Sequence, residues 1–187
     1  MNVYDFDNTI YKGDSTFDFY RFCALRHPKI FLRMPKLFID FIKFRTGSFT
    51  KTQFKEQMYK FLLNVPDIDL ELKIFWDKNI YKIKDFYKKA QKDDDVIISA
   101  SPEFLVIPAC ERIGIKHIMA SRVDKKTGKY TGENCHGKEK VKRFYEVFEN
   151  GVINDFYSDS YSDTPLAELA VNKSYMVKGN RLLDWKF

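Results

Sequence analysis

The feature that most constrains this chain lies in its first ten residues, where two aspartates stand two positions apart at the end of an apolar segment. Residues 1–6 are short, apolar and aromatic, and the polar stretch Asp7-Asn8-Thr9 follows them. This pattern is typical of a strand that runs into a turn. Side chains two positions apart on a strand point to the same side. Asp5 and Asp7 are therefore expected to project together, with Phe6 in the core.

Two carboxylates held this close repel each other unless a cation or a shared proton intervenes. Mg²⁺ prefers oxygen ligands and takes one or two carboxylates together with waters and phosphate oxygens. The other carboxylate could then attack phosphorus, because aspartate can form an aspartyl-phosphate. The alternative is that both aspartates are ordinary turn residues.

Polar residues further along the chain favour the chemical interpretation. Ser99 ends an apolar segment and could donate to a phosphoryl oxygen, with backbone N–H groups of the following turn beside it. Lys140 could place a positive charge against the phosphate. Asp159 is expected to bind the metal directly, and Asp163 through water or by orienting a neighbour. The alternatives are a helix cap for Ser99 or Asp163 and a solvated side chain for Lys140, with Lys138 as the competing lysine.

In this order and spacing, the residues resemble the four motifs of the haloacid dehalogenase superfamily of phosphatases. The branch they resemble is subfamily IB, which includes phosphoserine phosphatase. In that family the first aspartate of the first motif is the nucleophile and the second is the general acid and base. The resemblance implies catalytic residues Asp5, Asp7, Ser99 and Lys140, substrate contacts from Asn8, Thr9, Ser99, Ala100 and Lys140, and Mg²⁺ at Asp5, Asp7, Asp159 and Asp163.

Several positions depart from that family pattern. Asn8 stands where the family often has Gly, and Asn tolerates a left-handed backbone better than most residues, so the turn should persist. Ser158 replaces a common Gly, and Ser162 replaces the Asn of phosphoserine phosphatases. The segment after Gly47 lacks the arginine that phosphoserine phosphatases use for the substrate carboxylate, which disfavours phosphoserine as the substrate.

From Asp95 onward, apolar strands alternate with helices, which predicts a doubly wound parallel sheet with its ligands at the carboxyl ends of the strands. The expected fold class is α/β, a three-layer Rossmann-like core with an inserted α-helical cap. Residues 1–12 and 91–187 are assigned to the core and 13–90 to the cap. The expected core elements are strand 95–100, helix 103–113, a hairpin near Thr127-Gly128, helix 138–149, strand 152–157, helix 164–170 and strand 174–177.

Residues 13–90 carry repeated helix signals. Helix starts are expected at Ser15, Pro35 and Thr50 and after Pro66, and Gly47 is expected to end the second helix. In that second helix, apolar and charged side chains occupy separate faces. The apolar face comprises Leu37, Phe38, Phe41 and Ile42, and the charged face comprises Lys36, Asp40 and Lys43.

Charge is concentrated in the same region. The chain has a net charge of +6, yet residues 21–60 contain ten basic and two acidic side chains. This stretch could steer an anionic substrate or contact an anionic membrane, and its apolar content would suit a lipid phosphate. The alternative is that the basic residues only solvate the outer helix faces while the aromatic residues form the core of the cap.

The remaining composition favours an intracellular enzyme. Three scattered cysteines indicate neither a disulfide framework nor a zinc site, and the three histidines are not at metal-ligand spacing. No apolar run has the length of a membrane span, so a cytoplasmic protein is expected.

The resulting hypothesis is a Mg²⁺-dependent phosphomonoester hydrolase that acts through an aspartyl-phosphate on a lipid phosphate or a small phosphorylated metabolite. The alternatives are a phosphotransferase that uses the same intermediate and a non-catalytic protein that binds anionic lipid. Nucleic acid is not an expected partner, because the basic stretch contains no recognition motif.

Overall fold

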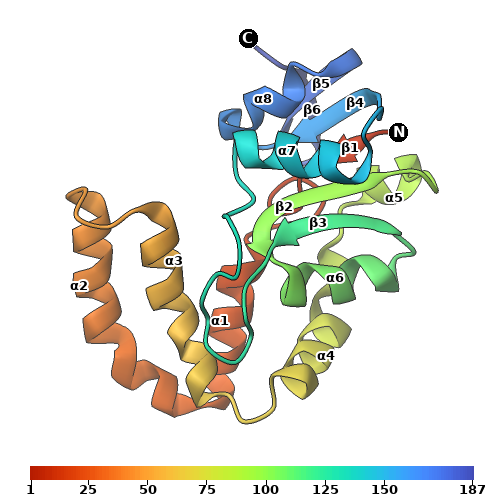
Figure 1. The fold of residues 1–187 in the computed structure, drawn as a ribbon. Coiled ribbons are helices and arrows are strands. Elements are labelled where there is room, and N and C mark those ends of the chain that lie inside the picture. The colour runs from red at the N-terminus through yellow and green to blue at the C-terminus, as the bar shows by residue number, and fades with distance from the viewer.

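A computed structural model describes all 187 residues, and its centre is a six-stranded sheet (Figure 1). The strand order is β3-β2-β1-β4-β5-β6. The first five strands are parallel, and β6 pairs antiparallel with β5 at one edge. The α/β fold expected from the sequence is confirmed, although β3 and β6 were not expected. The strands are β1 (Val3–Tyr4), β2 (Val96–Pro102), β3 (His117–Ser121), β4 (Ile153–Ser158), β5 (Ala170–Lys178) and β6 (Arg181–Asp184).

Helices begin where side chains can satisfy free backbone N–H groups. The Asp14 carboxylate accepts from the N–H of Phe17, and Thr50 forms a capping box with Gln53. These two starts confirm the sequence-based expectation. The helices are α1 (Ser15–Arg26), α2 (Met34–Arg45), α3 (Lys51–Tyr59), α4 (Ile68–Asn79), α5 (Asp85–Ala90), α6 (Glu103–Arg112), α7 (Lys138–Val147) and α8 (Thr164–Ala167), and α5 was not expected.

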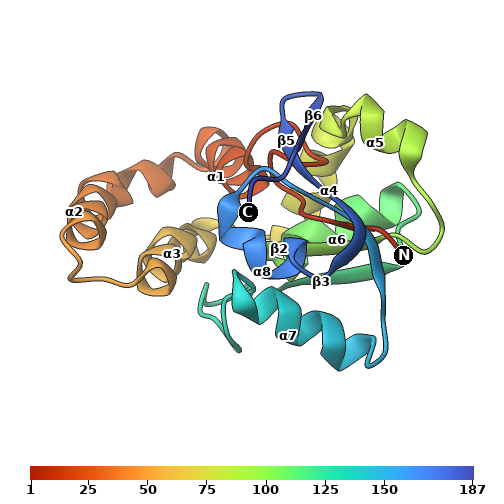
Figure 2. The same ribbon diagram turned by 90° about the horizontal axis from the view of Figure 1, so that it is seen from above.

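Two apolar clusters cover the two faces of the sheet and make it the middle of three layers (Figure 2). Successive residues of a strand point to opposite faces. In β2, Ile97 belongs to the cluster that contains Phe75 of α4 and Val106 of α6. The next residue, Ile98, belongs to the cluster that contains Phe144 of α7. Burial on both faces explains why Val96–Ile98 of β2 is continuously apolar.

The insertion between β1 and β2 divides into two parts. Helices α1 and α4 pack against each other and against α6, so they share the core of the sheet. A 3₁₀ helix (Pro28–Arg33), α2 and α3 form a hairpin that extends away from that core, here called the arm (Figure 1).

The packing of α2 differs from the alternative interpretation in which the aromatic residues form the core of the cap. Phe41 and Phe44 do contact Phe54 of α3. Phe38 and Ile42, on the predicted apolar face, are exposed, whereas the charged residue Asp40 is buried. The aromatic-core alternative does not hold for the outer side of α2, because only α3 is available to cover this helix.

Two expectations from composition can be compared with the structure. The three cysteines, Cys23, Cys110 and Cys135, are free and buried, as expected. None of the helices combines the length and the hydrophobicity that a membrane span requires.

The hairpin at Gly128 contacts Tyr59 at the end of α3. A substitution at Gly128 therefore tests whether this contact holds the arm against the rest of the molecule. Gly128 has a φ of +72°, and a Cβ atom there would lie 2.8 Å from backbone atoms of Tyr59. Gly128→Ala is expected to lower the free energy of unfolding by about 2 kcal/mol or more, measured by urea denaturation, since strain and overlap add. Gly179→Ala is the control, because Gly179 has a φ of +63° but open space around it. Equal losses in the two variants would contradict the contact.

Candidate functional site

The carboxyl ends of β1, β2 and β4 meet the inner side of the arm at a cavity of about 200 Å³. It contains every site residue predicted from the sequence except Thr9, which lies buried directly behind it. The lining residues are Asp5, Asp7, Asn8, Asp14, Lys51, Lys55, Ser99, Ala100, Ser101, His136, Lys140, Asp159, Ser160, Ser162 and Asp163.

Asp5 is held at the end of β1 by its N–H, which donates to the carbonyl of Tyr157 at 2.9 Å. One carboxylate oxygen accepts from Lys140 Nζ at 2.6 Å, and the other accepts from Thr9 Oγ1 at 3.5 Å. Burial raises the pKa of Asp5 to about 7, although the Lys140 charge acts in the opposite direction. Asn8 follows with a φ of 55°, the only residue other than glycine with a positive φ, so the left-handed turn expected there is confirmed.

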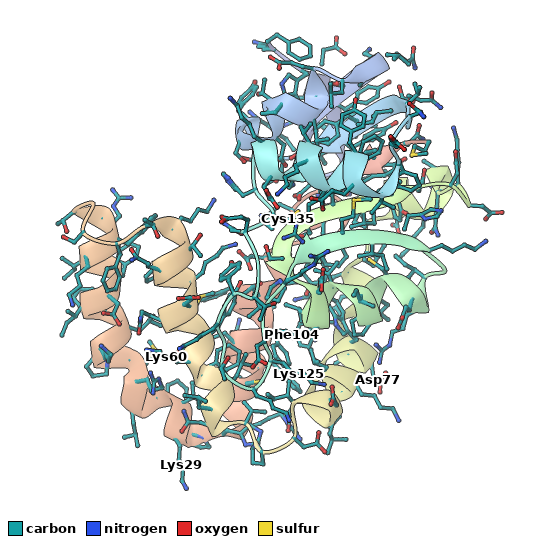
Figure 3. The ribbon with its side chains drawn as sticks, in the orientation of Figure 1. Lys29, Lys60, Asp77, Phe104, Lys125 and Cys135 are labelled. Atoms are coloured by element: carbon teal, nitrogen blue, oxygen red, sulfur yellow. The ribbon has the colours of Figure 1, made fainter.

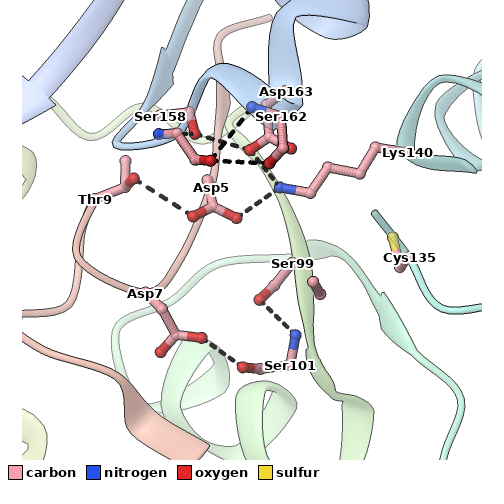
Figure 4. Close-up of polar contacts among 12 residues, drawn as sticks. Asp5, Asp7, Thr9, Ser99, Ser101, Cys135, Lys140, Ser158, Ser162 and Asp163 are labelled. Atoms are coloured by element: carbon pink, nitrogen blue, oxygen red, sulfur yellow. Dashed lines mark hydrogen bonds and ion pairs between the residues drawn. The ribbon is translucent and has the colours of Figure 1, made fainter. Parts of the chain in front are cut away.

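Lys140 lies between two carboxylates (Figure 4). Its Nζ donates to Asp5 Oδ1 at 2.6 Å and to Asp163 Oδ2 at 2.7 Å. Burial disfavours the charge, but Asp5 and Asp163 outweigh it and raise the pKa of Lys140 above its ordinary value. Lys138 is exposed and lies outside the cavity. The structure therefore places Lys140, and not Lys138, against the Asp5 carboxylate.

Asp7 lies in the same cavity but has different partners (Figure 4). Its Oδ1 accepts from the backbone N–H of Ser15 at 2.6 Å, at the start of α1. Its Oδ2 accepts from the hydroxyl of Ser101. Burial and the nearby Asp14 raise the pKa of Asp7 to about 6, while these hydrogen bonds oppose the rise. An acidic group with a pKa near neutrality is suited to general acid–base chemistry.

Ser99 is buried at the end of β2, and its Oγ accepts from the N–H of Ser101 at 3.1 Å. The hydroxyl proton is left free to donate to a bound group. Helix α6 begins four residues later with Pro102 at its N-cap and no side-chain capping bond. The helix-cap alternative for Ser99 is therefore wrong.

The turn after β4 brings in the last acidic pair. Asp163 Oδ2 accepts from Ser158 Oγ at 2.7 Å as well as from Lys140, and Asp163 makes no capping bond to α8. Its other oxygen, Oδ1, is buried without a hydrogen-bond partner. Burial and the nearby Asp163 raise the pKa of Asp159. The backbone N–H of Asp159 donates to Thr9 Oγ1 at 2.9 Å, which joins this turn to the β1 turn.

The four predicted metal-binding carboxylates do not converge on one point. No three side chains of Asp, Glu, His or Cys form a group that could hold a metal ion. Both Asp7 carboxylate oxygens are hydrogen-bonded, and one oxygen of Asp163 is bound by Lys140. Asp5 Oδ2 has only the long 3.5 Å contact with Thr9, and the Asp159 side chain makes no hydrogen bond, so these two carboxylates remain as ligands. One or two carboxylates are what Mg²⁺ usually takes. The unpartnered Asp163 Oδ1 is a further acceptor beside them.

Sequence reasoning missed three basic side chains of this cavity: Lys51, Lys55 and His136. Lys55 Nζ donates to the carbonyl of Ala100 at 2.9 Å, and burial lowers the pKa of Lys55 to about 8. Burial also lowers the pKa values of Lys51 and His136. The N-cap at Thr50 did indicate a helix, and Lys51 and Lys55, which are four residues apart, share one face of it. Only the packing of the arm shows which way that face points.

Comparisons with known proteins agree with this geometry. A sequence model of the haloacid dehalogenase-like hydrolase family matches residues 3–168. A protein from Mycobacterium tuberculosis named as a probable phosphatase is 37% identical over 95 residues, which cover 47% of this chain. The same segment covers only 33% of that relative's length.

Solved structures show the same fold. A protein of unknown function from Bordetella pertussis has a TM-score of 0.73 at 23% identity, with 93% of this chain and 87% of that chain covered. A phosphoserine phosphohydrolase-like protein from Francisella tularensis has a TM-score of 0.57 at 18% identity, with 93% and 86% covered.

Proposed function

The chain belongs to the haloacid dehalogenase-like hydrolase family, and on this premise we propose that it is a phosphatase that hydrolyses phosphate monoesters through an aspartyl-phosphate on Asp5. The observation that carries the proposal is the buried contact of Asp5 with Lys140, inside a cavity that also holds Asp7 and Ser99. The relative named as a phosphatase supports the same reaction.

In the first step, an Asp5 carboxylate oxygen attacks phosphorus and the bond from phosphorus to the ester oxygen breaks. Lys140 and the hydroxyl of Ser99 stabilise the charge on the phosphoryl oxygens. Asp7 in its acid form gives its proton to the departing alkoxide, which leaves as an alcohol. The Ser101 hydroxyl and the Ser15 N–H hold the Asp7 carboxyl group for this transfer.

In the second step, water attacks the phosphorus of the aspartyl-phosphate and the acyl-phosphate bond breaks. Asp7, now ionised, accepts a proton from that water, so inorganic phosphate leaves and both aspartates return to their starting states. The same carboxyl group thus serves first as acid and then as base.

A Mg²⁺ ion is the cofactor that the donor set fits best. Asp5 and Asp159 would hold it, while Asp163 positions Lys140 and the Asp7 side chain stays available for proton transfer. When bound, the ion would supply positive charge against the phosphoryl group and lessen the repulsion between the substrate and the acidic residues.

The direct test is a screen of phosphate monoesters, both soluble and in lipid vesicles, with Mg²⁺ and with a chelator. Hydrolysis of at least one ester is expected with Mg²⁺, and it should stop when the chelator is added. Absence of turnover on every ester would contradict the proposal.

For the substrate, we propose that residues 13–90 act as a cap and that its helix α3 binds a second anionic group. Lys51 and Lys55 add two positive charges on the arm side of the cavity, opposite the acidic residues of the sheet. A phosphorylated small molecule with a further carboxylate or phosphate would complement them.

Removing these two charges gives a test of that substrate class. Lys51→Met/Lys55→Met is expected to raise KM about tenfold or more for an ester with a second anionic group, because a charge-assisted contact is lost. For an aryl phosphate without such a group, KM should change little. Lys60→Met is the control: Lys60 lies beside α3 but donates to Gln57 Oε1 outside the cavity (Figure 3).

The pH dependence gives a second readout of the same proposal. Because the pKa of Lys55 is about 8, its positive charge is present below that pH and is lost above it. KM for the doubly anionic ester should therefore rise above pH 8 in the wild type and stay flat in the variant. An equal rise in KM for both kinds of ester would mean that the two lysines shape the cavity and do not bind a second anionic group.

A further inference from the structure

The outer side of the arm carries a concentrated apolar surface. Leu32 is 81% exposed, Phe38 64%, Ile39 54% and Ile42 46%, all within eleven consecutive residues. Isolated exposed apolar side chains are normal, but a contiguous group marks a surface that contacts something else. These four residues are called the arm ridge below.

The arm ridge results from the amphipathic pattern of α2. The inner side of this helix packs on α3 through Phe41 and Phe44, which contact Phe54. With 3.6 residues per turn, Phe38, Ile39 and Ile42 fall on the side of α2 opposite Phe44, and Phe41 lies at the border between the two sides. No other element lies beyond α2, which is the outermost helix of the arm (Figure 1).

The charged residues around the arm ridge are nearly all basic. Residues 28–45 contain five basic side chains and a single acidic one, Asp40. Asp40 is buried and lies 3.6 Å from Lys36 Nζ and 4.0 Å from Lys43 Nζ, so it presents no free anion. Lys29 projects away from the rest of the molecule at the base of the arm (Figure 3).

We propose that the arm ridge docks the protein on the surface of an anionic lipid bilayer. A helix with an apolar face and flanking lysines lies in the headgroup region, where its apolar side chains leave water and its cations meet lipid phosphates. A second copy of the chain would fit poorly, because a two-fold interface would bring Lys36 and Lys43 toward the basic residues of the same surface on its partner.

The docking surface and the catalytic cavity lie on opposite sides of the arm. Lys51 and Lys55 reach the cavity from α3, whereas the arm ridge lies on the far side of α2 and, with Leu32, on the 3₁₀ helix before it. Docking therefore does not depend on the proposed phosphatase activity, and binding can be measured without any substrate.

The test is sedimentation of the protein with vesicles of phosphatidylcholine, with and without phosphatidylglycerol. Wild-type protein is expected to bind only the anionic vesicles, and added salt should weaken binding. Phe38→Ser/Ile42→Ser should reduce the partition coefficient about tenfold or more. Lys36→Gln/Arg45→Gln should reduce the partition coefficient about thirtyfold. This variant leaves Lys43 in place beside Asp40.

Matched controls distinguish binding through the arm from non-specific binding through other exposed apolar or basic residues. Val147→Ser/Val171→Ser removes two equally exposed apolar side chains outside the arm, and Lys89→Gln/Lys186→Gln removes two exposed lysines without ion-pair partners. Both controls should bind anionic vesicles as the wild type does. In Phe38→Trp, tryptophan emission should shift to shorter wavelength when anionic vesicles are added, a change that Val171→Trp should lack.

Three results would overturn the proposal. The first is absence of wild-type binding to anionic vesicles. The second is equal binding by the arm variants and their controls. The third is a wild-type dimer in sedimentation velocity that Phe38→Ser/Ile42→Ser dissociates, which would assign the arm ridge to self-association. Phe38→Trp keeps an apolar side chain, so it tests insertion even if the serine variants are less stable.

Discussion

Asp5→Asn should abolish hydrolysis of phosphate monoesters while the protein remains folded. The amide has nearly the shape of the carboxylate but cannot form the acyl-phosphate. We expect kcat to fall below about a hundredth of the wild-type value, measured with a soluble aryl phosphate under saturating Mg²⁺. Asp155→Asn is the control, because Asp155 lies on β4 outside the cavity and bonds Asn172. Activity above that limit would contradict the assignment of Asp5 as nucleophile.

The stability of Asp5→Asn follows from the pKa of the residue that it replaces. Because burial raises the pKa of Asp5 to about 7, the folded protein holds this proton more tightly than the unfolded chain does. Without metal, the Asp5 contribution to wild-type stability should therefore fall as pH rises from about 4 to 7, and it should stay low above pH 7. Asn does not titrate, so at pH 8 the variant should unfold at the wild-type urea concentration or above it. A much lower urea midpoint for the variant would mean that the Asp5 carboxylate stabilises the folded protein.

Lys140→Met should impair both catalysis and stability. Loss of the charge beside the phosphoryl group is expected to lower kcat by about a hundredfold or more. The variant also leaves the Asp5 and Asp163 carboxylates buried without their shared cation, which should cost about 3–5 kcal/mol of stability by urea denaturation. Lys138→Met, on the same helix but exposed, should change neither quantity.

A double variant separates the two roles of Lys140. Lys140→Met/Asp163→Asn removes one cation and one anion together, so it should recover part of the lost stability without recovering kcat. Recovery of kcat along with stability would show that Lys140 acts only by holding the fold. Loss of activity in Lys138→Met instead would mean that Lys138, and not Lys140, is the lysine that acts on the phosphoryl group.

The candidate site residues at the ends of the strands were the part of the site that sequence reasoning could find. Asp5, Ser99 and Asp159 each follow a short apolar segment, and the carboxyl ends of parallel strands meet at one edge of a sheet. Helix starts at Asp14 and Thr50 were equally accessible, because a cap depends on residues three or four positions away. These features arise from local patterns, and local patterns are present in the chain before it folds.

Two strands show where local patterns were insufficient. His117–Ser121 lies between a helix and a polar hairpin, and all four residues of Arg181–Asp184 are exposed at the sheet edge. Neither has the continuous apolar character that identified the central strands. Their pairing with β2 and β5 supplies the backbone partners that make them strands.

The sequence alone determined the central strands, most of the helices, the carboxylates and hydroxyl at the strand ends, and a lysine near the start of α7. The tertiary structure decided three further points. Lys140, and not Lys138, contacts Asp5; Lys51 and Lys55 line the cavity; and the arm ridge is exposed. The physical reason is the same in each case. Periodicity tells which side chains share a helix face, whereas burial, ion pairing and solvent exposure depend on the surface that packs against that face. For α7 and α3 that surface is the acidic end of the sheet, and for the outer side of α2 the chain provides none.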